Sequence, residues 1–246
     1  MSLLNPHCSV RIKRIGQSQS PLIIIEQCWA EPEKLQSLAN DKAAYVDDPD
    51  DFYPGLRKPL PDNITAQIHT ALKEALQQVL SEGVNNDLGE ALDKAAFKRF
   101  TLPFCAFSLT NQAPDTLIPI QRIPHFDSTS HRQFALVSYL FHEDKGGTAF
   151  YRHKKTGFET IDDTRAKTYM KALQTEASTQ GFPEAAYIQG STSMFEHIHS
   201  EAAQFNKCIL YPANLLHSGN INPKTSLSSS PQQGRLTLNA CLDASF

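Results

Sequence analysis

From residue 100 onward the chain is a series of short segments rich in aromatic and β-branched residues, separated by turn-forming residues. Such segments predict β-strands, and a run of them at this spacing predicts a sandwich or a barrel. We expect the phenylalanines within them, Phe104, Phe134, Phe141 and Phe150, to belong to the core. The predicted strands cover residues 100–109, 117–123, 134–141, 148–151, 193–198, 205–211 and 235–242.

The residues before this series have a mainly helical pattern. A strand-like apolar run at 22–25 precedes a short helix predicted at 33–40. Apolar residues then recur at three- and four-residue spacing from Ile64 to Leu80, after Asp62, which is a suitable helix N-cap. The chain therefore reads as an α+β protein, mainly β. We predict one domain over residues 1–246, with a helical N-terminal flank at 1–99 and a β core at 100–246.

Two further segments interrupt the predicted β core. Residues 162–177 have a polar helical pattern, and the serine-rich stretch at 223–233 predicts a flexible loop. Both lie between predicted strands, so we expect them to decorate the core and not to form a second domain.

Charge and cysteine usage restrict the kinds of partner and compartment. The chain has 246 residues, with 23 basic and 26 acidic side chains and a formal charge of −3. Such a balance provides no broad positive field, so we expect neither nucleic acid nor a membrane as a partner. The five cysteines are dispersed and never form a CxxC pair. They read as reduced thiols, and the longest early apolar run is too short for a membrane span, so we expect a cytoplasmic protein.

Histidines two residues before a carboxylate are the first candidate metal ligands. Alternate strand residues point to one face, so such a pair can bind one ion. Nine histidines and 26 acidic residues predict about one H-x-[DE] triplet by chance, and the chain has three. His125-Phe126-Asp127 lies where a predicted strand opens into a polar loop, which is a suitable position for a site. The triplet at 142–144 runs into a surface turn at Gly146-Gly147, and the third is at 199–201.

His217 is the candidate third ligand. It follows the apolar segment 211–216 and stands just before Gly219. Two histidines and one carboxylate bind Fe(II) on one face and leave three positions open for a chelating substrate and O₂. Taken alone, a histidine in the position of His217 is more often a hydrogen-bonded residue at a strand end, and it is the combination with His125 and Asp127 that favours a ligand.

The last predicted strand adds a candidate anion site. Its alternation places Arg235, Thr237, Asn239 and Cys241 on one face and leucines on the other. An inward arginine is costly to bury without an anion, and a dicarboxylate would supply one. The alternative is an arginine at a sheet edge in solvent.

Taken in order, these motifs resemble the Fe(II)/2-oxoglutarate-dependent dioxygenase superfamily, in particular its prolyl-4-hydroxylase-like branch. The resemblance covers residues 100–246 and includes Gly146-Gly147-Thr148-Ala149-Phe150 between the two histidine motifs. More distantly, the chain is similar to uncharacterised bacterial proteins found alongside flavin-dependent tryptophan halogenases. Two features depart from the family pattern: an interval of 18 positions between His217 and Arg235, and the long insertion at 154–192.

The resemblance implies a double-stranded β-helix, which is a jelly-roll or cupin-like barrel. It further implies that iron is the metal, that Arg235 and Thr237 hold the distal carboxylate of 2-oxoglutarate, and that Tyr139 and Asn239 belong to the same pocket. The implied iron ligands are His125, Asp127 and His217.

The implied reaction is hydroxylation of a small molecule, amino acid or peptide by O₂, with conversion of 2-oxoglutarate to succinate and CO₂. Related halogenases replace the carboxylate ligand by a small residue, so Asp127 favours hydroxylation. The segment Tyr53-Pro54-Gly55-Leu56-Arg57 matches no known substrate-binding module.

Two other hypotheses stay open. One is a cupin-like metalloenzyme or sugar-binding barrel that uses His197, His199 and Glu201. The other is a degenerate, non-catalytic barrel that acts as a binding protein. The cupin-like hypothesis predicts that His199→Ala loses the metal. The non-catalytic hypothesis predicts that the folded chain takes up no iron.

Overall fold

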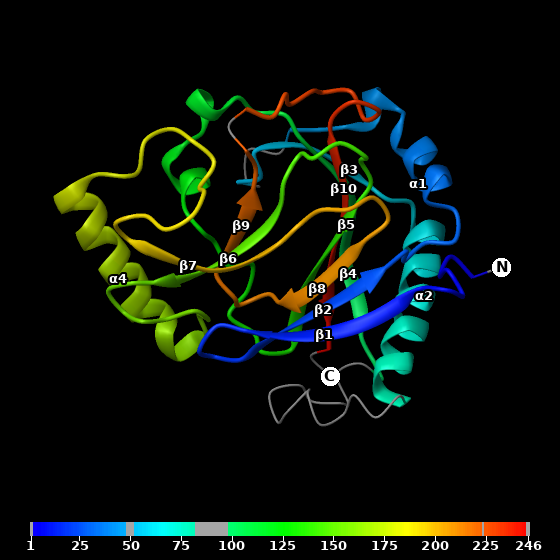
Figure 1. Ribbon diagram of the computed structural model, residues 1–246, viewed down its shortest axis with the longest axis horizontal. Helices are drawn as coiled ribbons and strands as arrows, with labels where there is room; N and C mark the ends of the chain where they lie inside the picture. The colour runs from blue at the N-terminus through cyan, green and yellow to red at the C-terminus, as the bar shows by residue number, and fades with distance from the viewer. Residues whose placement is uncertain (1, 48–51, 82–97, 223, 245–246) are drawn as a thin grey trace.

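Two antiparallel β-sheets lie between helices in the computed structural model of the chain (Figure 1). The structure describes residues 2–47, 52–81, 98–222 and 224–244, and the side chains of 78–81 lie outside this description. The predicted apolar positions Val79 and Leu80 therefore fall outside it. None of the described helices is both long and apolar enough to cross a membrane.

The larger sheet has seven strands in the order β1-β2-β8-β5-β10-β4-β3, and the smaller has three in the order β7-β6-β9. Every strand pair is antiparallel. The strands of the larger sheet are β1 (Ser9–Ile15), β2 (Ser20–Glu26), β3 (Gly55–Pro59), β4 (Thr101–Thr110), β5 (Gln133–Tyr139), β8 (Cys208–Pro212) and β10 (Arg235–Asp243). Those of the smaller sheet are β6 (Gly147–His153), β7 (Phe195–Glu201) and β9 (His217–Asn220).

Helices α1 (Pro32–Ala39) and α2 (Asp62–Ser81) cover the outer face of the larger sheet, on the right of Figure 1. The spacing of Ile68, Leu72 and Leu76 places these residues on one side of α2, and all three are fully buried. They share a core cluster with Leu236 and Leu238 of β10. The leucine face of β10 is thus turned toward the helices, and the alternate face, which carries Arg235, is turned inward.

The inner faces of the two sheets pack on each other. Ile24 of β2, Val137 of β5 and Phe150 of β6 belong to this second cluster. The outer face of the smaller sheet packs against α4 (Asp163–Gln180), on the opposite side of the molecule from α1 and α2 (Figure 1). Asp162 caps α4 by accepting hydrogen bonds from the backbone of residues 164 and 165, which confirms the predicted helix.

The mainly β character of the chain is confirmed, and six of the predicted strands coincide with observed strands within a few residues. The predicted strand at 117–123 is wrong. The 3₁₀ turn η3 (Pro119–Arg122) lies in this region instead, and another such turn, η2 (Pro114–Thr116), comes before it. Each turn begins at a proline, which has no N–H to donate to a sheet.

The N-terminal part differs from the predicted helical flank. It contributes β1, β2 and β3 to the larger sheet, β2 beside β8 and β3 beside β4. Only the run at 22–25 signalled a strand, because the polar alternation of β1 and the short β3 resemble exposed loops. The core assignment of Phe104 is also wrong, since Phe104 is 38% exposed, whereas Phe134, Phe141 and Phe150 are buried.

Candidate metal centre

His125, Asp127 and His217 lie together, and each can direct one ligand atom to a common point. These atoms all lie within 4.8 Å of one another. The distance from His217 Nε2 to Asp127 Oδ2 is 3.6 Å, and that from His125 Nε2 to Asp127 Oδ1 is 3.7 Å. Separations of this size suit ligands placed around one ion with bonds of about 2 Å. Within the described ranges, these residues form the one such group of three histidine, cysteine or carboxylate side chains.

Backbone hydrogen bonds hold the three residues in place. His125 and His217 form an antiparallel bridge, in which His125 N donates to His217 O over 2.9 Å and His217 N donates to His125 O over 2.8 Å. Asp127 N donates to Ala213 O over 2.8 Å. The segment after η3 is therefore tied to the chain that leads into β9, although 117–123 forms no strand.

The ring of His217 is oriented by its own neighbourhood. Its Nδ1 lies 2.8 Å from Leu215 O. A carbonyl oxygen can only accept, so Nδ1 carries the hydrogen and Nε2 is left with a lone pair. Tyr211 packs against this ring at a centroid distance of 4.8 Å. Metal-binding histidines commonly have such a second contact, which fixes the tautomer needed for coordination.

The triad is closed on one side and open on the other. The side chain of His217 is 6% exposed, whereas those of His125 and Asp127 are 50% and 45% exposed. A mixed histidine and carboxylate set suits a divalent transition metal, and three ligands leave further coordination positions available. The open side is the one from which small molecules can approach.

Arg235 is buried on the inner face of β10, with 5% of its surface exposed. Its Nη2 donates to Gly147 O over 3.0 Å, and its Nη1 lies 3.4 Å from Thr110 Oγ1. Its Nε has no hydrogen-bond partner among the described residues. Nor does any carboxylate in the described part of the chain lie within ion-pair distance of it. Burying a guanidinium without a counter-charge costs free energy, so the surroundings of Arg235 suit an anion.

Thr237, Asn239 and Tyr139 lie on the same inner face. Thr237 pairs in register with Tyr139 across β10 and β5, and its hydroxyl donates to Asn239 Oδ1 over 2.6 Å. The Tyr139 hydroxyl is 2.8 Å from Thr148 Oγ1. Burial raises the pKa of Tyr139 to about 12, so its hydroxyl is neutral at physiological pH. The expected pocket residues therefore share one surface, and Arg235 provides its positive charge.

The alternative ligand set on β7 does not converge in the same way. His197 Nε2 is 2.6 Å from Ser200 Oγ, and His199 Nε2 is 3.6 Å from Glu201 Oε2. Glu201 also lies 3.1 Å from Lys207 Nζ. Burial would raise the pKa of Glu201, but its contacts with His199, Lys207 and Arg11 outweigh burial and lower the pKa to about 2. Glu201 thus already has partners within the protein.

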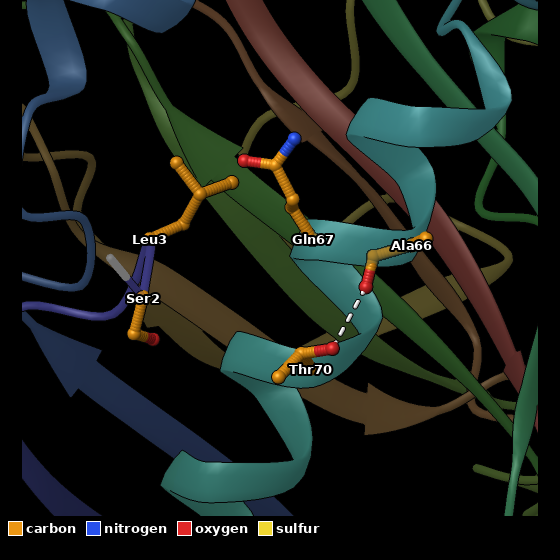
Figure 2. A pocket seen from close by; sticks show the side chains of 5 residues that line it. All are labelled: Ser2, Leu3, Ala66, Gln67 and Thr70. Atoms are coloured by element: carbon orange, nitrogen blue, oxygen red, sulfur yellow. Dashed lines mark hydrogen bonds between the residues drawn. The ribbon is translucent and has the colours of Figure 1, made fainter.

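A hollow of about 220 Å³ lies away from these residues, between the N-terminal segment and α2. Figure 2 shows its lining side chains, of which Thr70 donates to the carbonyl of Ala66 within the helix over 3.0 Å. The lining consists of Ser2, Leu3, Ala66, Gln67 and Thr70. It contains no histidine, cysteine or charged side chain, which are the side chains that most commonly hold a metal or an anion.

The structure adds Arg57 to the residues that the sequence singled out. Its guanidinium carbon lies 4.2 Å from the ring centroid of Tyr53 and 5.0 Å from that of Phe104. The sequence showed the segment 53–57 but gave no reason to join it to Phe104. A charged residue at the centre of a short strand, Gly55–Pro59, was the one available signal.

A family model described as "Family of unknown function (DUF6445)" matches residues 6–242. No curated protein gives a significant match to the sequence.

Three solved structures are among those to which this chain is similar. HygX from Streptomyces hygroscopicus, solved with nickel and 2-oxoglutarate, is 9% identical, with a TM-score of 0.49 over 93% of this chain and 84% of that one. SnoN, a non-heme alpha ketoglutarate dependent epimerase from nogalamycin biosynthesis, is 10% identical, with a TM-score of 0.43 over 92% and 78%. EctD from S. alaskensis is 12% identical, with a TM-score of 0.39 over 99% and 88%.

Proposed function

Because the chain belongs to DUF6445, a family of unknown function, we propose its activity from the site: it is a non-haem Fe(II)- and 2-oxoglutarate-dependent dioxygenase. The single observation that carries this proposal is the convergence of His125, Asp127 and His217 within 4.8 Å. In this proposal the two stacked sheets are the walls of a double-stranded β-helix of the prolyl-4-hydroxylase-like branch.

The three convergent residues would hold Fe(II) through two imidazoles and one carboxylate. Leu215 O accepts from Nδ1 of His217, so that Nε2 would be the atom that binds the ion. When bound, iron and 2-oxoglutarate supply the oxidising chemistry, in which O₂ is consumed and 2-oxoglutarate becomes succinate and CO₂. The carboxylate of Asp127 would serve as a ligand where a halogenase has a small residue to admit a halide, so the proposed reaction is hydroxylation.

Arg235 would hold the distal carboxylate of 2-oxoglutarate. Its buried Nε has no hydrogen-bond partner among the described residues, and an incoming carboxylate supplies both an acceptor and a counter-charge. The neutral hydroxyl of Tyr139 would donate a further hydrogen bond, and the hydroxyl of Thr237 would do so after turning away from Asn239 Oδ1, its acceptor in the structure. Gly147 O and Thr110 Oγ1 keep the guanidinium in place.

We place the reaction in the cytoplasm and take its substrate to be a small molecule, an amino acid or a peptide. All five cysteines are free thiols in the structure, which supports a reducing compartment.

An anaerobic titration with Fe(II) and 2-oxoglutarate tests the proposed function. The parent protein should develop a visible charge-transfer band, and Asp127→Ala and His125→Ala should not. On admission of O₂, the parent alone should form succinate. A folded parent protein that develops no band contradicts the proposal and supports the degenerate, non-catalytic barrel.

A further inference from the structure

Arg57 lies on the same face of the larger sheet as the proposed 2-oxoglutarate pocket. In register, Arg57 of β3 pairs with Ser108 of β4, Ser108 pairs with Thr237 of β10, and Thr237 pairs with Tyr139 of β5. Residues directly opposite each other in a sheet emerge on one face. Adjacent strands are about 4.8 Å apart, so the backbone of Arg57 is roughly 10 Å from that of Thr237.

The side chain of Arg57 points back over the sheet. Its Nη1 donates to Ser108 Oγ over 2.8 Å, and its guanidinium lies over the rings of Tyr53 and Phe104. The charge is therefore held above β4, toward β10, and not beyond the edge of the sheet. Aromatic rings against the faces of a guanidinium leave its N–H groups directed along its edges, which is the arrangement that recognises carboxylates.

Two contact paths join Arg57 to the proposed site. On one path, Phe104 is in register with Cys241. Cys241 is in register with Ala135 and Ala135 with Tyr211, whose ring packs against that of His217 at a centroid distance of 4.8 Å. On the other path, the Tyr53 hydroxyl is 2.7 Å from Thr110 Oγ1, which Arg235 Nη1 approaches to 3.4 Å. Arg57 thus lies on the sheet face that leads to the ring of His217 and, through Tyr53 and Thr110, to the anion pocket.

Exposed apolar side chains accompany this arginine. Phe104 is 38% exposed and Phe52 is 61% exposed. The side-chain amide of Gln121 donates to Phe52 O over 3.2 Å, which ties this residue to η3, where Ile118 and Ile120 are 46% and 37% exposed. Large apolar groups gathered in solvent indicate a surface that binds an apolar partner.

We propose that Arg57 binds the carboxylate of the substrate, whose apolar body lies against Phe104 and Phe52. This inference rests on the proposed function and names its substrate class, an aryl or alkyl carboxylic acid. The two arginines then have separate tasks: Arg235, which is buried, binds the co-substrate, and Arg57, which is half-buried, selects the substrate.

Calorimetric binding of 3-phenylpropionate and its neutral amide, 3-phenylpropionamide, tests this inference. The protein is first saturated anaerobically with Fe(II) and 2-oxoglutarate, so that the pocket of Arg235 is filled. The parent should bind the acid at least about tenfold more tightly than the amide, as expected for a charge-assisted hydrogen bond. Arg57→Gln should bring this ratio close to one and leave the affinity for 2-oxoglutarate within about threefold of the parent's.

Lys58→Gln is the matched control, because it removes the same charge from the next residue of β3, on the opposite face. Lys58 Nζ donates to Leu38 O, and its loss should leave the acid-to-amide ratio at the parent value. Phe104→Ala, at an exposed position, should lower the affinity for the acid and for the amide by the same factor. It keeps the inference testable if Arg57→Gln does not fold.

Several outcomes overturn the inference. An acid-to-amide affinity ratio near one in the parent, or an unchanged ratio in folded Arg57→Gln, contradicts it. So does a Phe104→Ala variant that binds both probes as tightly as the parent. The last such outcome is an Arg57→Gln variant that loses affinity for 2-oxoglutarate and keeps the acid-to-amide ratio. Failure of the proposed function is recognised separately, because the parent then forms no charge-transfer band. The same two probes are in that case titrated into protein without metal or 2-oxoglutarate, where the ratio still reports on Arg57.

Discussion

His125 and His217 face each other across an antiparallel bridge, and the centroids of their rings lie 4.3 Å apart. The two backbones exchange both hydrogen bonds of this bridge. Their mutual position is therefore set by main-chain geometry, and either side chain can be removed without breaking the bridge. This makes the proposed ligands suitable for substitution experiments.

We expect His217→Ala to remove metal binding while the protein stays folded. The substitution deletes the most buried of the three candidate ligands. The loss in affinity should exceed the roughly 10–100-fold that loss of an outer hydrogen-bond partner costs. Equilibrium dialysis against Fe(II) without oxygen measures it. His142→Ala is the control, since His142 begins another H-x-[DE]-type triplet but is exposed and stacks on Phe205 at 3.9 Å. Equal metal retention in both variants would contradict the assignment.

His199→Ala should retain the affinity of the parent for Fe(II). The ring of His199 lies beside Glu201, whose carboxylate is already held by Lys207 and Arg11. The same dialysis measurement is used. A loss of bound metal in this variant, with His125 and Asp127 intact, would favour the cupin-like alternative over the proposed centre.

Arg235→Met should lower the affinity of the protein for 2-oxoglutarate and leave its affinity for the metal unchanged. Removing one partner of a buried charge pair costs about 2–5 kcal/mol of binding free energy. Titration of 2-oxoglutarate into the Fe(II)-loaded protein, followed by the visible band, measures the change.

The same variant makes a second prediction for the protein without ligands. The guanidinium of Arg235 is buried without a counter-ion among the described residues, so replacing it by an apolar side chain should leave the thermal midpoint unchanged or raise it. A parallel loss of iron and 2-oxoglutarate, together with a lower midpoint, would show that Arg235 acts in folding and not as a co-substrate ligand.

Glu201→Gln should lower the free energy of unfolding by about 2 kcal/mol at pH 7, the scale of a hydrogen bond to a charged group. The pKa of Glu201 is lowered to about 2 in the folded protein, so its stabilising effect is fully present above the ordinary glutamate pKa of about 4.3. This contribution is lost as the pH falls from there toward 2.

Urea unfolding at pH 7 and at pH 3 measures both effects of the glutamine substitution. The difference between parent and Glu201→Gln should shrink at the lower pH. Glu31→Gln is the control, because Glu31 pairs with Lys34 at an exposed position and should cost less than about 1 kcal/mol. A difference for Glu201→Gln that grows on acidification would refute the lowered pKa.

Much of the local structure could be predicted because it depends on nearby residues. The alternation of Arg235 with Leu236 correctly separated the inner face of β10 from the leucine face that packs on α2. The polar helical pattern at 162–177 correctly predicted α4, which begins directly after Asp162. The strand predicted at 117–123 is wrong because the prediction relied on the apolar residues of this segment. It did not take account of Pro119, which has no N–H to donate to a sheet.

By itself the sequence determined which side chains within one element share a face, and it nominated His125, Asp127, His217 and Arg235. Periodicity carries this information because it follows from backbone geometry. Only the tertiary structure decided that β3 joins β4, so that Arg57 comes to lie on the face of Arg235. Strand pairing depends on hydrogen bonds and burial between segments distant in the chain, and no local pattern encodes which edge a short strand will complete.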